Sequence, residues 1–178
     1  MPLHMVKANW RQRVKSAALS LSLLAFPTGL QAKEAPQVLP IEAEWCLPSR
    51  ECIQLEVADE QQEKSIGMQL RGPLPPLRGM WFPFQDVLLR FWMHRTLEPL
   101  DMVFINDQRV VAIEANASPC PRLPCRSYGP DTPADGVVEL AAGEASRLGI
   151  TVGSPAVITP YKSPKPKPAA RPATPARD

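Results

Sequence analysis

One stretch of the sequence, residues 92–101, brings together aromatic, titratable and hydroxyl side chains. Trp92, His94 and Thr96 alternate along it, so in an extended segment they share one face. An apolar wall with a few polar groups is typical of a small-ligand pocket. The structural alternative places Trp92 in the core and His94 at the end of a strand. The pattern alone leaves both interpretations open.

Two charged residues are candidates to complete such a pocket. Asp101 precedes the apolar run 102–105 and is either a general base or a turn residue whose carboxylate binds backbone amides. The forked guanidinium of Arg71 suits an anionic ligand, unless it is solvated or paired with Glu98 or Asp101. We therefore add Asp101 to the predicted ligand site and place Arg71 at its rim.

Catalysis has little support in the sequence. Beyond residues 1–32 the chain has one histidine, and it lacks a Gly-x-Ser-x-Gly elbow, a phosphate loop and a dinucleotide fingerprint. A hydrolase-like enzyme that uses His94 and Asp101 as acid and base is the alternative. Because catalysis needs paired groups that the sequence does not display, we predict a binding protein without catalytic residues or a cofactor.

The methionines suggest a third hypothesis. Met68, Met80, Met93 and Met102, together with His94, would form a soft ligand set for copper(I). Methionine also fills irregular gaps in apolar cores. Since the four methionines follow no ligand spacing, we predict that they pack in the core and that no metal is bound.

The four cysteines form two close pairs, Cys46/Cys52 and Cys120/Cys125. An even number of cysteines at short spacing in an oxidising compartment is typical of disulfides. Three connectivities are possible, and a zinc site would need four converging thiolates at a spacing that neither pair has. We expect each pair to form a local bridge that holds its own loop.

The net positive charge of the 178-residue chain, +2 overall, comes from its two ends. Residues 1–32 carry +4 and residues 160–178 carry +4, which leaves −6 for residues 33–159. A mildly acidic central part argues against nucleic-acid binding through a basic face. No segment reaches the roughly 18 uninterrupted apolar residues of a membrane span.

Residues 1–32 have the order of a secretory signal peptide. Four bases precede the apolar run 17–26, and Ala32 supplies the small residue before a cleavage site. A buried amphipathic helix is the alternative, but the run has no polar face. We predict that the protein is exported to the periplasm or the extracellular space.

Residues 33–159 are expected to form a single, mainly β (β-rich α+β) domain with one or two short helices. Apolar alternation and turn signals place its elements. Strands are expected at 38–46, 52–58, 79–84, 87–93, 100–105, 110–115 and 137–140, and helices at 59–67 and 141–148. Residues 160–178 hold six prolines among lysines, which predicts a disordered tail.

Several motifs of this domain resemble the family called domain of unknown function 192, or uncharacterised protein family 0127. The resemblance covers residues 53–158 and is carried by three runs with fixed spacing. They are Gly79-Met80-Trp81-Phe82-Pro83-Phe84, then Phe91-Trp92-Met93 with Thr96 and Pro99-Leu100-Asp101, and finally Glu139-Leu140 with Leu148-Gly149-Ile150. The resemblance implies a compact, barrel-like β domain that is often exported, and it implies no reaction.

Two local features qualify this resemblance. The loop from Pro119-Cys120 to Cys125 looks like that of cyanobacterial members. Members usually have Lys-Asn where this chain has His94-Arg95, so no role of that lysine carries over. We predict an exported monomer whose partner is a small polar or anionic molecule or a component of the cell envelope.

Overall fold

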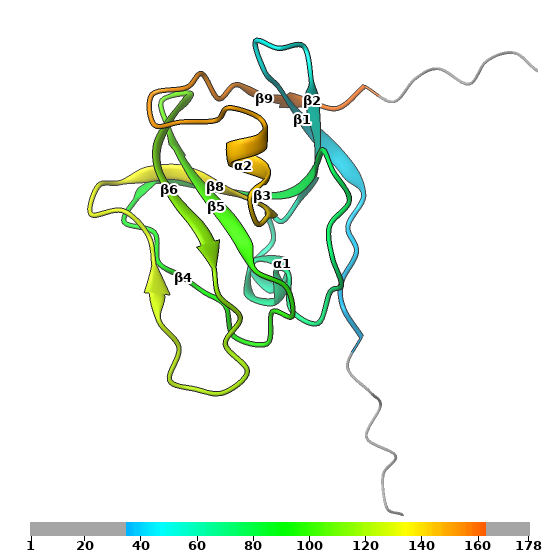
Figure 1. Ribbon diagram of the computed structural model, residues 1–178, viewed down its shortest axis with the longest axis vertical. Coiled ribbons are helices and arrows are strands. Elements are labelled where there is room, and N and C mark those ends of the chain that lie inside the picture. The colour runs from blue at the N-terminus through cyan, green and yellow to red at the C-terminus, as the bar shows by residue number, and fades with distance from the viewer. Residues whose placement is uncertain (1–34, 163–178) are drawn as a thin grey trace, which may run out of the picture. The chain divides into compact units, whose positions relative to one another are not determined.

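The computed structural model describes residues 35–162 (Figure 1). The predicted signal peptide at 1–32 and residues 163–178 of the predicted tail lie outside this part of the chain. The described residues form nine strands and two short helices. In chain order they are β1 (Ile41–Cys46), β2 (Cys52–Val57), α1 (Gln61–Ile66), β3 (Arg78–Val87), β4 (Phe91–Trp92), β5 (Leu100–Asn106), β6 (Arg109–Ala117), β7 (Ser127–Tyr128), β8 (Ala134–Ala141), α2 (Glu144–Arg147) and β9 (Ile158–Pro160).

The strands form one large sheet and one small ladder. The large sheet has seven strands in the order β6-β5-β8-β3-β2-β1-β9, and β4 pairs only with β7. Neighbouring strands are antiparallel except β2 and β3, which are parallel and are connected through α1. A parallel pair needs such a crossover. The prediction of a mainly β single domain with two short helices is confirmed.

The sheet is not closed into a barrel, which corrects the barrel-like expectation. Strands β6 and β9 remain its two edges. The segment before β9 meets the start of β6 at a single bridge, from Arg109 to Pro155, and then turns toward β1. Strand β9 itself pairs only with β1, through three residues, so no continuous ladder joins the two edges of the sheet.

Alternation along the central strands divides the interior into two cores. On β5, Met102 and Phe104 face one side, whereas Val103 and Ile105 face the other. The first side belongs to what we call the methionine core, which contains Met68, Met80, Phe82, Met93, Leu100, Met102, Phe104 and Val137. The second is the α2 core, with Trp45, Ile53, Leu55, Val103, Val138, Leu140, Ala145 and Leu148. Helix α2 lies against β5 and β8 (Figure 1).

The segment 87–93 differs from its predicted continuous strand. Strand β3 runs on to Val87, the chain then leaves the large sheet, and only Phe91 and Trp92 pair again, with β7. A run that is apolar at every position except Arg90 gives no alternation from which to locate a strand. Leu88 is exposed and Leu89 is buried. Residues 88–90 therefore form a connection between β3 and β4 and are not a strand of the large sheet.

Two turns also differ from their expected form. Helix α1 begins after Glu60, whose N–H donates to the Glu63 carboxylate at 3.2 Å, so the cap lies one residue later than the Asp59 start expected. The β5–β6 hairpin has two turn residues, Asp107 and Gln108, where four were expected. Their φ angles are 45° and 58°, and left-handed pairs of this kind match the twist of a hairpin.

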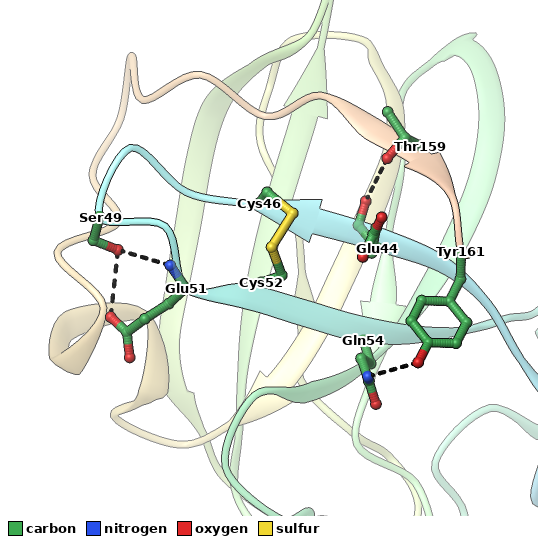
Figure 2. The surroundings of a disulfide bond; sticks show 8 residues. All are labelled: Glu44, Cys46, Ser49, Glu51, Cys52, Gln54, Thr159 and Tyr161. Atoms are coloured by element: carbon green, nitrogen blue, oxygen red, sulfur yellow. Dashed lines mark hydrogen bonds between the residues drawn. A yellow bond between two sulfur atoms is a disulfide. The ribbon is translucent and has the colours of Figure 1, made fainter. Parts of the chain in front are cut away.

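Both disulfides are local, as predicted. Cys46 and Cys52 join β1 to β2 with Cα atoms 4.0 Å apart, and Cys120 pairs with Cys125 in the loop before β7. Figure 2 shows the first bridge and, further along the same strands, the end of β9, where Gln54 Nε2 donates to the Tyr161 hydroxyl at 3.1 Å. Pro160 and Tyr161, which were assigned to the tail, therefore belong to the folded part.

The disulfides suggest an oxidising, extracytoplasmic setting. Among residues 35–162, no helix has the length and apolar character needed to cross a membrane.

Candidate ligand pocket

A pocket of about 520 Å³ lies over the methionine core. Its lining comes from α1, from β3, from the connection 87–92 and from Glu139 on β8. Apolar side chains from β3 and the connection 87–92 form one part of the lining, and eight polar side chains, among them Lys64, Arg90 and Glu139, complete it. This size and composition are those of a small-molecule site.

Four aromatic side chains form the apolar wall of this pocket: Phe82, Phe84, Phe91 and Trp92. Phe91 contacts Phe82 edge to face, with ring centroids 5.3 Å apart, and contacts Phe84 in the same manner at 6.2 Å. Such edge-to-face pairs fix the ring orientations. The rim is apolar as well, because Leu88 is 61% exposed and Trp92 is 60% exposed.

Glu139 is the buried polar group of the pocket. It faces the methionine core because its register partners on β3 and β5 are Met80 and Met102, both fully buried. The residue is 4% exposed, and within residues 35–162 its carboxylate makes no hydrogen bond or ion pair. Burial raises the pKa of Glu139 from its ordinary 4.5 to about 8, so the carboxyl group is mainly protonated at pH 7.

Sequence reasoning missed Glu139, although a signal was present. The run Val137-Val138-Glu139-Leu140 was expected to be a strand, and its acid was given no role. An acid at an inward position of a central strand is rare without a partner. Only the register shows that this position faces the pocket.

The structure brings Trp92, His94 and Thr96 together around this pocket. The Trp92 and His94 rings meet edge to face, with centroids 6.4 Å apart. Thr96 is buried, and a backbone bridge joins it to Gln69. The exposure of Trp92 shows that the core interpretation of this residue is wrong.

Arg71 lies in an ion pair at a second, smaller pocket of about 190 Å³. This pocket shares Met68 and Thr96 with the first. The guanidinium donates to both oxygens of Glu56, at 2.6 Å and 2.8 Å, and Glu56 also accepts from the Leu39 N–H at 2.9 Å. The guanidinium of Arg71 thus binds the buried carboxylate of Glu56. Its expected partners, Glu98 and Asp101, do not take part in this ion pair.

Asp101 does not join the pocket. Alternation along β5 turns its side chain toward α2, where it accepts the N–H of Ala145 at 3.0 Å and the N–H of Asn116 at 2.8 Å. Asp101 is 1% exposed, so both carboxylate oxygens serve backbone amides. The structure therefore does not bring His94 and Asp101 into one site.

The metal candidates separate in the same way. The four methionines all lie in the methionine core, each no more than 4% exposed. Among residues 35–162, Glu44, Cys46 and Cys52 form the one group of three acid, histidine or cysteine ligands with atoms within 4.8 Å of one another. Because the two sulfurs are bonded to each other, they are not thiolate ligands.

The open mixed sheet, with a pocket on one face and a small helix on the other, defines a compact β-rich domain with a small-molecule-sized site. Residues 41–158 match the model of the family described as "Uncharacterized ACR, COG1430", domain of unknown function 192. The match spans more than half of the chain, and the chain belongs to this family. The resemblance stated from the motifs is thereby confirmed, whereas the likeness to cyanobacterial members stays a prediction.

Two solved structures are similar to this chain. A protein of unknown function from Novosphingobium aromaticivorans DSM 12444 is 30% identical with a TM-score of 0.59, covering 71% of this chain and 93% of its own. A protein from Sinorhizobium meliloti 1021, described as a "putative transcription regulator", is 27% identical with a TM-score of 0.60, covering 70% and 97%. No curated protein matches the chain.

Proposed function

We propose that this protein is a non-catalytic binding protein that holds a small molecule in the pocket over the methionine core. The observation that carries the proposal is the pocket itself. A volume of about 520 Å³ with an aromatic wall and one buried carboxyl group fits a small ligand with an apolar body. Residues 1–32 and the two disulfides support action outside the cytoplasm.

Binding has better support than the alternatives. An acid–base pair of His94 and Asp101 would need both side chains at one site, and Asp101 is turned toward α2. A nucleic-acid partner is disfavoured because residues 33–159 carry a net charge of −6. An envelope component would meet only the apolar rim, whereas a concave pocket of about 520 Å³ matches a small molecule.

A thermal-shift screen of small molecules on the purified protein tests the proposal. A ligand that binds only the folded state raises the melting temperature. Trp92→Ala should remove that shift without unfolding the protein, because Trp92 is 60% exposed. Val152→Ala is the matched control, since Val152 is 65% exposed and lies outside the pocket lining. Ligands that shift both variants equally would place the site elsewhere and contradict the proposal.

A further inference from the structure

The described part of the chain contains four buried acids, and three of them have partners. Glu56 binds Arg71 through both oxygens, Asp101 accepts two backbone N–H groups, and Glu144 accepts from Arg147 and from the Leu77 N–H. Buried acids in folded proteins are paired or hydrogen-bonded in this manner. The fourth, Glu139, has no such partner within residues 35–162.

The space that Glu139 faces is the aromatic pocket. Phe82, Phe84, Phe91 and Trp92 line it, and the faces of aromatic rings attract cations. One ring already carries an ammonium group of the protein itself. The Lys64 amine lies 4.5 Å from the centroid of Phe84. The Phe84 face thus already holds a cation, and Phe82, Phe91 and Trp92 are the rings of the wall that a ligand cation would meet.

The other charged groups near the pocket come from several elements. Helix α1 contributes Lys64 at the Phe84 face. The connection to β4 contributes Arg90, which is directed at Asp131 and at the carbonyl oxygens of Leu89 and Pro130. His94 follows β4 in the lining, whereas Glu56 on β2 lies outside the lining and is neutralised by Arg71. Glu139 is thus the one acid that lines the pocket in the described chain.

We infer that the pocket takes an organic cation, a protonated amine or quaternary ammonium group on an apolar body, with Glu139 as its counter-ion. This inference deepens the proposed small-molecule function and rests on it. The aromatic side chains contact the apolar body of the ligand and one side of its cationic group. The Glu139 carboxylate supplies the opposite charge. The exposed apolar rim at Leu88 and Trp92 accommodates the part of the ligand that reaches solvent.

Binding of such a cation is coupled to a proton. Burial gives Glu139 a pKa of about 8, so in the empty pocket the group is protonated at pH 7 and must release its proton when a cation binds. Affinity for a permanent cation should therefore rise about tenfold between pH 7 and pH 9 and level off above that. A ligand that accepts a hydrogen bond from the protonated carboxyl group would show the opposite trend.

The test uses benzyltrimethylammonium, whose charge does not change with pH. Its dissociation constant for the purified full chain is measured by NMR titration at pH 7, 8 and 9, beside benzyl alcohol and benzoate as neutral and anionic probes. We expect the ammonium compound to bind most tightly and its affinity to rise about tenfold over this range. Affinity that falls with pH, or benzoate as the tightest probe, would overturn the inference.

Variants separate the inference from the proposed function. Glu139→Gln should remove the pH dependence and weaken ammonium binding at pH 9 by about tenfold or more. Glu114→Gln is the matched control, because Glu114 lies on the same sheet outside the pocket lining. This variant should keep the wild-type dependence of ammonium affinity on pH.

If benzyl alcohol binds at Trp92 but Glu139→Gln changes nothing, the inference fails while the proposed function stands. If no probe binds and the screen is empty, the proposed function fails.

Discussion

The buried acids of this domain differ in their effect on the free energy of unfolding, according to whether the carboxylate has a partner. Asp101 and Glu56 hold backbone and side-chain donors that would otherwise be unpaired, so they stabilise the fold. Glu139 has no partner within residues 35–162, and its burial opposes its own ionisation. Residues that cost stability are typical of functional sites. The contrast separates the acid of the proposed site from those of the scaffold.

Glu139→Gln should change how stability depends on pH. The folded-state pKa of about 8 lies above the ordinary 4.5, so the folded protein binds the extra proton between these values. Stability is therefore lost as pH rises from 4.5 to 8, by about 3 kcal/mol at pH 7. Relative to the wild type, Glu139→Gln should gain stability between pH 5 and pH 9 in urea unfolding. An equal loss at every pH would mean that Glu139 has a stabilising partner.

Asp101→Ala should destabilise the protein without affecting ligand binding. The substitution leaves the N–H groups of Asn116 and Ala145 without acceptors, at a cost of about 2–4 kcal/mol. Asp101→Asn, which keeps one acceptor oxygen, should lose less. Urea unfolding gives the stability, and titration with a ligand from the screen gives the affinity. Weakened binding at unchanged stability would instead assign Asp101 to the site.

The sequence predicted the chemistry at some of these positions and not at others. The alternation of Trp92, His94 and Thr96 follows from local spacing, and all three line one pocket. Glu139 lies more than forty residues further along the chain. It reaches the pocket only because β8 inserts between β3 and β5, and single-sequence spacing carries no information on that pairing.

At the scale of elements, local signals were sufficient where neighbours in sequence pair with each other. The strands expected at 38–46 and 52–58, and those at 100–105 and 110–115, follow from turn signals and alternation, and they form the β1–β2 and β5–β6 hairpins. The parallel pairing of β2 with β3 and the separation of β4 from the sheet were not. Both depend on long-range contacts, and the apolar run before β4 has no period that would distinguish a strand from a connection.

The two disulfides should differ in their effect on binding. Cys120 holds the pocket rim, because its N–H donates to the Met93 carbonyl and its own carbonyl accepts from the Arg95 N–H. Removing Cys120–Cys125 by paired alanine substitution should weaken ligand binding several-fold. Removing Cys46–Cys52 should leave affinity unchanged, since that bridge lies in the β1–β2 hairpin (Figure 2).

Each loss should cost about 2 kcal/mol in urea unfolding, because both closed loops are short. The β1–β2 variant thereby controls for stability. Equal affinity in the two variants would contradict a role of the Cys120–Cys125 loop in the pocket rim.

At the scale of the whole molecule, the end of the folded part is set by β9. Truncation after Val157 should lower the free energy of unfolding by more than about 1 kcal/mol, since it removes β9 and the Tyr161 contacts to Glu42 and Gln54. Truncation after Lys162 should change it little, in keeping with the predicted tail. Equal unfolding curves for both truncations would show that β9 contributes nothing.

Export can be tested on the whole chain. We expect mass spectrometry of the cell-envelope fraction to find a protein that begins at Lys33, because the signal pattern ends at Ala32. A control with Lys7, Arg11, Arg13 and Lys15 replaced by glutamate should remain in the cell. An intact Met1 end in the envelope fraction would contradict the prediction of cleavage.

The small β4–β7 ladder gives the pocket two parts with different rates of motion. Glu139 and Phe82 belong to central strands of the seven-stranded sheet, whose amides should exchange with solvent only through global unfolding. Trp92 belongs to a ladder of two residues in each strand, which can open locally while the sheet stays intact. The central strands then determine how tightly a ligand is held. The local opening of the β4–β7 ladder determines how often a ligand can enter or leave the pocket.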